Sequence, residues 1–240
     1  MTTTAEKMIS YIRRNRVSTT EIGDALGKSG VIPKVHALTS DHFKVGRARC
    51  VFTAFDSNYD LHDQIKTISE GDIVLVFAHR CDGRALLGDL IAKYILLYRG
   101  AESIVVAGHV RDASRLRREH YPIWAEGVTP LGCYNVPAKP FPAALANNIR
   151  AKYEGGIAVC DDGGVAVIPP DRLNDDMLER LRRIELQEDV WYYCLNTLKW
   201  DTKKIVCDKA YLTETEVVPE PFRAELGRLG RPLDAKKARR

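Results

Sequence analysis

The sequence predicts an α/β fold in which helices cover a parallel or mixed sheet. The chain has 240 residues, of which 45% are hydrophobic and 28% charged, so it is long enough to bury a substantial core. Strand-like and helix-like segments alternate between residues 60 and 108, a pattern typical of α/β proteins. The most apolar runs, 73–77 and 104–107, have the length of strands.

The first half of the chain supplies most of this pattern. Residues 5–15 and 18–28 predict two short helices, and Ser18 followed by Glu21 marks the start of the second. Residues 43–55 alternate and are rich in Val, Phe and Thr, which indicates a strand. The repeating unit that follows is predicted as a helix at 60–69, a strand at 72–78, a helix at 85–98 and a strand at 103–108.

After residue 112 the pattern loosens into short apolar runs separated by Gly and Pro, as expected for strands joined by tight turns. The predicted strands are 123–125, 133–136, 157–160 and 165–168, and a charged helix is predicted at 171–187. We therefore expect a main domain over 1–187, an aromatic extension over 188–218 that packs on the core or on a neighbouring subunit, and a basic, weakly ordered tail over 219–240. No internal repeat is found.

Composition excludes several classes of protein. No apolar run is long enough to cross a bilayer, and the N-terminus has no export signal, so we expect a cytoplasmic protein without a membrane partner. The six cysteines are far apart and are expected to be reduced. The net charge is only +4, and the basic residues that close the chain favour a solvated end over a nucleic-acid contact.

Two short stretches carry the residues best suited to chemistry. Gly88 lies where a loop enters a helix, so backbone N–H groups near it are free to receive an anion such as a carboxylate. Arg111 and Asp112 follow the strand 103–108, at the carboxyl end where open α/β sheets place their sites. Asp89, Arg111 and Asp112 are therefore candidates to hold a metal and an anionic substrate.

Each candidate also has a structural explanation. An isolated Arg-Asp pair is usually a surface ion pair, and an acid such as Asp89 is favourable in the first turn of a helix for electrostatic reasons alone. Spacing by itself does not decide between these readings.

Seven short blocks, in the same order along the chain, give the sequence a wider resemblance. From about residue 19 to residue 169 it resembles the RraA-like family, which groups 4-hydroxy-4-methyl-2-oxoglutarate / 4-carboxy-4-hydroxy-2-oxoadipate aldolases with the regulator of ribonuclease activity A. The blocks that carry the resemblance are 22–27, 45–48, 70–76, 84–89, 108–112, 126–130 and 161–165.

The resemblance implies a swivelling-type α/β/α sandwich with a mixed sheet that forms a homotrimer or hexamer. It implies that Asp112 binds Mg²⁺ or Mn²⁺, that Asp89 holds a metal-bound water, and that Arg111 contacts the carboxylate of a small 2-oxo acid. The turn at Leu87 and Gly88 resembles the loop whose amides receive that carboxylate. A further acid is expected from a neighbouring subunit, and we nominate Glu185, Glu188 or Asp189.

The activity that the resemblance implies is a metal-dependent class II aldolase, which releases pyruvate from a 4-hydroxy-2-oxo acid and also decarboxylates oxaloacetate. The residue types are consistent with this chemistry, because a hard cation held by carboxylates stabilises the enolate left by bond cleavage, and Arg111 adds a permanent charge.

The sequence departs from the family around the predicted pocket. His109 stands where a small residue is usual and is a candidate for specificity or substrate binding. Residues 78–82 replace a glycine-rich turn, which leaves Arg80 and Asp82 as further substrate contacts, and His79 without an assigned role. Residues 152–156 also differ. Two alternatives therefore remain: a non-catalytic regulator of a ribonuclease, and a lyase on the same scaffold that acts on another 2-oxo acid or a sugar acid.

Overall fold

The computed structural model describes residues 3–229, which divide into two compact units on either side of Asn174. The first unit is built on one eight-stranded mixed sheet with the strand order β1-β6-β5-β3-β2-β7-β8 and β4 paired to β5. The strands are β1 (His36–Ala37), β2 (Lys44–Ala54), β3 (Asp72–His79), β4 (Ala85–Leu87), β5 (Ser103–Val110), β6 (Ile123–Val128), β7 (Ile157–Asp161) and β8 (Gly164–Ile168). The predicted α/β class with a mixed sheet is confirmed.

The centre of the sheet is parallel and its two ends are antiparallel. β2, β3, β5 and β6 run parallel, as does β4 beside β5, whereas β1, β7 and β8 pair antiparallel. The carboxyl ends of β2 to β6 therefore meet at one edge of the sheet. Asp89, Arg111 and Asp112 follow two of these ends, those of β4 and β5.

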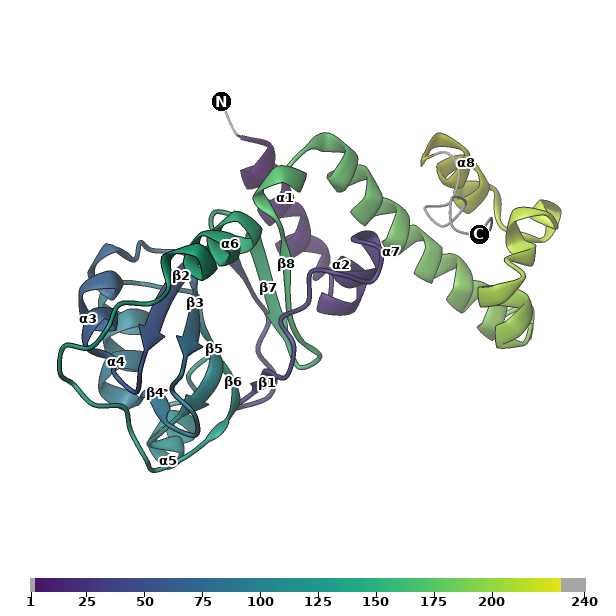
Figure 1. Cartoon of the computed structure of the whole chain (residues 1–240). Coiled ribbons are helices and arrows are strands. Elements are labelled where there is room, and N and C mark those ends of the chain that lie inside the picture. Colours follow the sequence, from purple (N-terminus) through teal and green to yellow (C-terminus); the bar gives the residue numbers. More distant parts are fainter. Residues whose placement is uncertain (1–2, 230–240) are drawn as a thin grey trace. The chain divides into compact units, whose positions relative to one another are not determined.

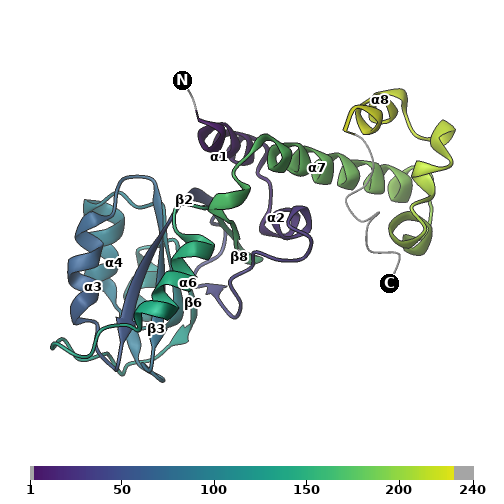
Figure 2. The ribbon, with the colours of Figure 1, turned by 45° about the horizontal axis from the view of Figure 1, so that its top comes forward.

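Period-two alternation in the central strands divides the core into two clusters. Val74, Val76, Ile104 and Val106 face one side, where they pack with residues of α3 (Tyr59–Gln64) and α4 (Asp89–Lys93). These two helices lie side by side on that face in Figures 1 and 2.

The other side of the sheet encloses the second cluster. Ile73, Leu75 and Val105 pack there with Ala158 of β7 and Val167 of β8. Trp124 of β6, near the other end of the sheet, belongs to the same cluster. Strands from both ends thus share one core, because the mixed sheet is curved until it is nearly closed. The remaining helices of this unit are α1 (Thr4–Asn15), α2 (Thr19–Ala25), α5 (Ala113–Arg118) and α6 (Ala143–Tyr153), with 3-10 turns at Ile65–Thr67 and Pro170–Arg172.

Several predicted elements need correction. The helix predicted at 85–98 begins only at Asp89, because Ala85–Leu87 form the buried strand β4 and Gly88 ends it; the helix closes with a π-turn at Tyr94–Tyr98. The strand predicted at 133–136 is a loop held by isolated bridges. The helix predicted at 18–28 ends at Ala25. Strand β1 and the helices α5 and α6 had not been predicted.

The second unit is helical. The helix predicted at 171–187 is instead α7 (Asp175–Asn196), so the predicted boundary at residue 187 falls inside an unbroken helix. A π-turn (Lys203–Cys207), 3-10 turns (Ala210–Leu212, Thr215–Val217) and α8 (Glu220–Leu229) follow. The first ten residues after Pro219 are thus helical, and the basic tail 230–240 lies outside the described residues.

The aromatic residues of the extension explain why it folds. A separate hydrophobic cluster within the extension buries Cys194, Ile205 and Tyr211. Trp191 and Trp200 pack against this cluster. That the extension packs on the core or on a neighbouring subunit stays a prediction. No helix in the described part of the chain is long and apolar enough to cross a membrane.

Candidate active site

The predicted residues Asp89, Arg111 and Asp112 line one cavity of about 290 Å³ at the carboxyl edge of the sheet. Asp89 opens α4 directly after β4, and Asp112 opens α5 after β5. β4 and β5 are parallel neighbours, so their ends bring together residues that are 23 positions apart. Figure 1 shows β4 and α5 at the same end of the sheet.

The two acids are joined by the backbone. The N–H of Asp89 donates a hydrogen bond of 3.2 Å to Oδ2 of Asp112. The N–H of Arg111 donates to the carbonyl of Leu87 at 3.0 Å, which fixes the two turns against each other. Two amides of the turn at Gly88 are therefore engaged by carboxylates of the protein, that of Asp89 by Asp112 and that of Leu90 by Asp89. The binding of a substrate carboxylate by this turn stays a prediction.

Gly88 is required by close packing. It has an extended backbone, with φ −136° and ψ −160°, that any residue can adopt. A Cβ at this position, however, would overlap Oδ2 of Asp112 and lie 2.9 Å from Cγ of Arg111. The missing side chain is what allows Asp112 to approach the turn.

Asp112 has a left-handed backbone conformation, with φ 59° and ψ 32°. Asp and Asn tolerate this conformation better than most residues because their short polar side chains interact with the local backbone. Non-glycine residues in such conformations are found preferentially at functional sites. The conformation places the Asp112 carboxylate 3.6 Å from Nε of Arg111.

Arg111 is half exposed and reaches across the cavity toward the loop after β6. A Cβ on Gly132 would lie 2.8 Å from Nη1 of Arg111, so the guanidinium rests against the backbone there. The half-exposed guanidinium shares the cavity with the two acids, and its planar set of N–H donors suits it to bind a carboxylate.

Sequence reasoning missed Arg115. Its Nη1 lies 2.5 Å from Oδ2 of Asp89, and this hydrogen bond is the main reason that the pKa of Asp89 lies below its ordinary value. Desolvation opposes the shift, and a hydrogen bond involving Asp112 adds to it. Asp89 is thus held as a carboxylate. The only signal in the sequence was the position of Arg115 in the turn after Asp112.

Asn58 was missed as well. It is buried, lines the same cavity, and precedes α3. Its Nδ2 donates to the carbonyl of Leu86 at 3.1 Å, and a carbonyl can only accept, so the orientation of the amide is determined. Oδ1 is left buried without a hydrogen-bond partner in the described structure. Buried polar atoms of this kind are rare and often belong to functional sites.

The other predicted residues lie partly in this cavity and partly outside it. Leu87 and Gly88 line the cavity, but His109 is not among its lining residues. The ring of His109 lies over Gly127, where a Cβ would be 3.2 Å from Nε2. His79 packs against the rings of Phe55 and Phe141. A role for His109 in substrate binding stays a prediction.

Arg80 and Asp82 belong to the loop after β3. The Arg80 guanidinium stacks over Phe55 at 5.7 Å, and Asp82 is exposed. Glu185, Glu188 and Asp189, the nominated further acids, all lie on α7 in the second unit. Which of these acids assists the site stays a prediction.

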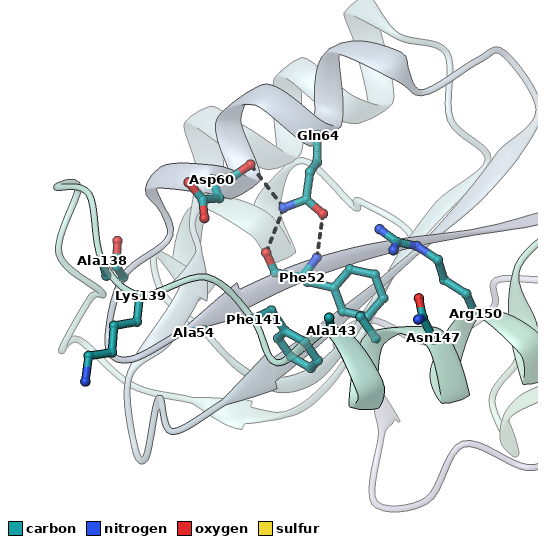
Figure 3. A pocket seen from close by; sticks show the side chains of 12 residues that line it. Phe52, Ala54, Asp60, Gln64, Ala138, Lys139, Phe141, Ala143, Asn147 and Arg150 are labelled. Carbon is teal, nitrogen blue, oxygen red and sulfur yellow. Dashed lines mark hydrogen bonds between the residues drawn. The ribbon is translucent and has the colours of Figure 1, made fainter.

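A second cavity, of about 260 Å³, lies beside β2 and contains none of the predicted residues. The Gln64 side chain of α3 bonds both backbone groups of Phe52 there, accepting from N at 3.0 Å and donating to O at 2.9 Å (Figure 3). The Gln64 amide thus makes the backbone hydrogen bonds that a neighbouring strand would otherwise make to β2 at Phe52. Asn147 and Arg150 enter this cavity from α6, and Arg150 lies 4.7 Å from the centre of the Phe52 ring.

The fold and the acid-lined cavity define a protein of the α/β class with a polar site at the carboxyl ends of parallel strands. Residues 19–167 match the signature of the RraA-like family, described as Aldolase/RraA, and the chain belongs to that family.

Two curated relatives carry the same name, "Putative 4-hydroxy-4-methyl-2-oxoglutarate aldolase". The protein from Halalkalibacterium halodurans is 26% identical over 200 residues, which cover 75% of this chain and 86% of the relative. The protein from Shewanella oneidensis is 25% identical over 113 residues, which cover 47% and 68%.

Solved structures agree on the fold. An uncharacterised protein from Pseudomonas syringae pv. tomato superposes with a TM-score of 0.64 at 20% identity, covering 80% of this chain and 90% of the other. A Streptomyces coelicolor protein, described as an unusual member of the RNase ES inhibitor RraA family, gives a TM-score of 0.59 at 25% identity, with coverages of 76% and 94%. The family thus contains proteins named as enzymes and proteins named as inhibitors.

Proposed function

We propose that the chain is a metal-dependent lyase that cleaves a 4-hydroxy-2-oxo acid to pyruvate and also decarboxylates oxaloacetate. The observation that carries the proposal is the convergence of Asp89, Arg111 and Asp112 on one cavity, with the two acids joined through the Asp89 amide. The names of the two curated relatives support an aldolase of this type.

The residues fit a hard divalent ion. The cavity offers two carboxylates and the amides of Asn58 and Asn135, which are oxygen ligands of the kind that Mg²⁺ and Mn²⁺ prefer. No group of three or more His, Cys, Asp or Glu within residues 3–229 has metal-binding geometry, so the ion would be held by Asp112, with Asp89 close by, and would keep several waters. When bound, Mg²⁺ or Mn²⁺ would supply Lewis-acid stabilisation of the enolate.

The protein's own side chains account for binding and orientation. Arg111 is placed to bind the substrate carboxylate through its exposed N–H groups, and its contact with Gly132 limits the directions that these groups take. Asp89 remains ionised because of Arg115, so it accepts hydrogen bonds and does not donate a proton. The turn at Gly88, whose amides the family resemblance assigns to the substrate carboxylate, lies beside Arg111 at the same cavity.

The test is pyruvate release by the purified chain, stripped with EDTA and then supplied with Mg²⁺ or Mn²⁺. 4-Hydroxy-4-methyl-2-oxoglutarate and oxaloacetate are the substrates, and lactate dehydrogenase reports pyruvate. Asp112→Asn is the sharpest variant, because Asn tolerates the left-handed backbone while losing the charge. We expect kcat/KM to fall at least ~100-fold, about 2.7 kcal/mol. Asp63→Asn is the matched control, because the Asp63 side chain is exposed on the surface of α3.

A regulator of a ribonuclease is the second candidate, favoured by the likeness to the Streptomyces coelicolor protein. The presence of both acids in the cavity argues for an enzyme. If a panel of 2-oxo acids and sugar acids gives no metal-dependent turnover while the protein binds and inhibits a ribonuclease, the regulator replaces the lyase. Turnover of another acid in that panel would keep the class of enzyme and change the substrate.

We also propose that copies of the chain assemble into a homotrimer or hexamer and that an acid of α7 serves the site of a neighbouring copy. Glu185→Gln, Glu188→Gln and Asp189→Asn separate the three nominees. The residue concerned should lower activity with little change in the oligomeric state measured by light scattering. If no variant lowers activity, none of the three acids takes part.

A further inference from the structure

Two histidine rings meet outside the cavity that holds Asp89 and Asp112. His42 lies in the segment between β1 and β2, and His120 follows α5. Nε2 of His42 and Nδ1 of His120 are 2.9 Å apart. Neither residue lines that cavity, and the proposed lyase reaction uses neither. Because imidazole nitrogen is a common ligand of transition metals, the pair is a set of potential metal ligands without an assigned role.

Contacts between the two segments hold the rings together. β1 pairs with β6 antiparallel and lies beside it in Figure 1. The pairing continues past β1, because the N–H of Leu38 donates to the carbonyl of Ile123 at 2.8 Å. The Thr39 hydroxyl then donates to the carbonyl of Tyr121 at 3.3 Å. These contacts set the positions of the segments that carry the two rings before any ligand binds.

Three donor atoms are grouped around the Nε2 proton of His42. Oγ1 of Thr39 lies 2.9 Å from Nε2, the same distance that separates Nε2 from Nδ1 of His120. Because the Thr39 hydroxyl proton points to Tyr121, an oxygen lone pair faces Nε2. A proton on Nε2 is thus shared between an oxygen acceptor and a nitrogen acceptor. A metal ion would replace this proton, which Nδ1 of His42 can take up, since no hydrogen bond within the described residues engages that nitrogen.

The distances fit an ion with right-angled coordination. Histidine nitrogen binds transition ions at about 2.0–2.1 Å, so two ligands at right angles are about 2.9 Å apart, whereas tetrahedral ligands are about 3.4 Å apart. The ring centres of His42 and His120 are 4.4 Å apart, too close for two rings that point straight at each other. At least one of the two nitrogens is therefore aimed beside the line that joins them. Square-planar and octahedral ions such as Cu²⁺ and Ni²⁺ match this arrangement better than tetrahedral Zn²⁺.

The charges around the pair are mixed. Asp41 precedes His42, and its N–H donates to the Asp162 carboxylate at 3.1 Å, so two carboxylates lie at this end of the segment. Lys44 carries an opposing charge, but it forms an ion pair with Glu102 at 3.6 Å. Within residues 3–229, no group of three or more His, Cys, Asp or Glu has metal-binding geometry, so water would fill the remaining coordination positions.

We propose that His42 and His120, with the Thr39 hydroxyl, form a metal site that is separate from the proposed lyase site and binds one divalent transition ion, Ni²⁺ or Cu²⁺. The ion joins the segment before β2 to the end of α5, the helix that begins after Asp112. Nitrogen ligands favour these ions, whereas the carboxylates near Asp112 suit a hard ion such as Mg²⁺. The site can be tested whether or not the lyase reaction is found.

The probe is Ni²⁺, added to the full-length chain expressed without an affinity tag, at about pH 7.5, where unperturbed histidine is neutral. Calorimetric titration should show one saturable site, and Ni²⁺ should raise the thermal unfolding temperature because the ion binds the folded state. The titration is repeated in Asp112→Asn, so that an ion at the proposed lyase site is not counted. In NMR spectra, paramagnetic Ni²⁺ should broaden the ring signals of His42 and His120 before those of the other histidines.

Two variants remove one nitrogen each. His42→Phe keeps a ring beside Trp124, and His120→Asn tolerates the left-handed backbone at this position, where φ is 52°. Each should lower the Ni²⁺ affinity at least ~10-fold, because the loss of a ligand costs no less than the loss of a residue that only orients one. His36→Ala is the matched control, since His36 is exposed on β1 and should not affect the affinity.

The NMR measurement uses the unmodified chain, so it decides the matter even if a variant folds poorly. Absence of saturable Ni²⁺ binding overturns the proposal. Binding that survives both histidine variants, or that is lost only in Asp112→Asn, places the ion elsewhere and overturns it as well. Broadening centred on histidines other than His42 and His120 has the same consequence.

Discussion

The Asp89 amide donates a hydrogen bond to the Asp112 carboxylate across 3.2 Å, and this bond, together with the one from the Arg111 amide to the Leu87 carbonyl, ties the turn after β4 to the turn after β5. Both acids of the candidate site therefore depend on the same local packing. Four predictions test how that packing and its surroundings work.

Gly88→Ala should disrupt the site. The added Cβ overlaps Oδ2 of Asp112 and crowds Cγ of Arg111, so both side chains must shift. We expect stability to fall by about 1–3 kcal/mol and the proposed pyruvate release to fall ~100-fold or more. Urea denaturation and steady-state kinetics measure the two effects. Gly227→Ala, where a Cβ meets nothing within 4 Å, is the control; it should leave pyruvate release unchanged and, because Ala favours the helix α8 more than Gly does, should not lower stability.

Arg115→Ala should raise the pKa of Asp89 toward the ordinary value, about 3.9. Since Arg115 lowers the pKa in the folded state, the pair stabilises the fold at neutral pH, and this contribution is lost as pH falls through the lowered pKa. Arg115 is largely exposed, so solvent screens the pair and we expect only a small loss of stability. A carboxyl NMR titration checks the pKa. An unchanged Asp89 titration in Arg115→Ala would show that the ion pair does not form in solution. Arg117→Ala, in the same helix, is the control and should leave the Asp89 titration unchanged.

Asn58→Asp should make stability depend on pH. A carboxylate in place of the Asn58 amide would face the Leu86 carbonyl that Nδ2 now bonds, which costs about 1–3 kcal/mol at pH 7. Burial raises the pKa of the new acid, and its protonated form can donate to that carbonyl. The variant should therefore recover stability at acid pH and lose it as pH rises through the raised pKa. Thermal unfolding from pH 4 to pH 8 gives the answer, and a pH-independent difference from the parent contradicts this reasoning.

Gln64→Ala should destabilise the protein without touching the proposed site. Its amide satisfies both backbone groups of Phe52 on the side of β2 where no strand pairs. Losing both bonds should cost about 1–3 kcal/mol, because water replaces them only in part. Chemical denaturation measures the loss, and Asp63→Ala on the same helix should be nearly neutral. A loss of less than ~0.5 kcal/mol would mean that solvent replaces the amide.

Periodicity explains why the central strands could be predicted and the segments around them could not. The apolar runs that became β3 and β5 are buried on both faces, so local pattern alone marks them. Ala85–Leu87 is equally apolar but only three residues long, so its local pattern predicts the start of the following helix. Its state as a strand depends on pairing with β5, which lies outside any local window.

The sequence by itself determined the α/β class, the membership of the RraA-like family, and the positions of Asp89, Arg111 and Asp112 after two strands, because each of these depends on local periodicity or on short contiguous blocks. The tertiary structure alone decided that Arg115 holds Asp89 and that Asn58 keeps an unpaired oxygen beside the cavity. These contacts join residues from different strand ends and loops. They arise because parallel strands bring their carboxyl ends to one edge of the sheet, and no spacing along the chain encodes which side chains then face one another.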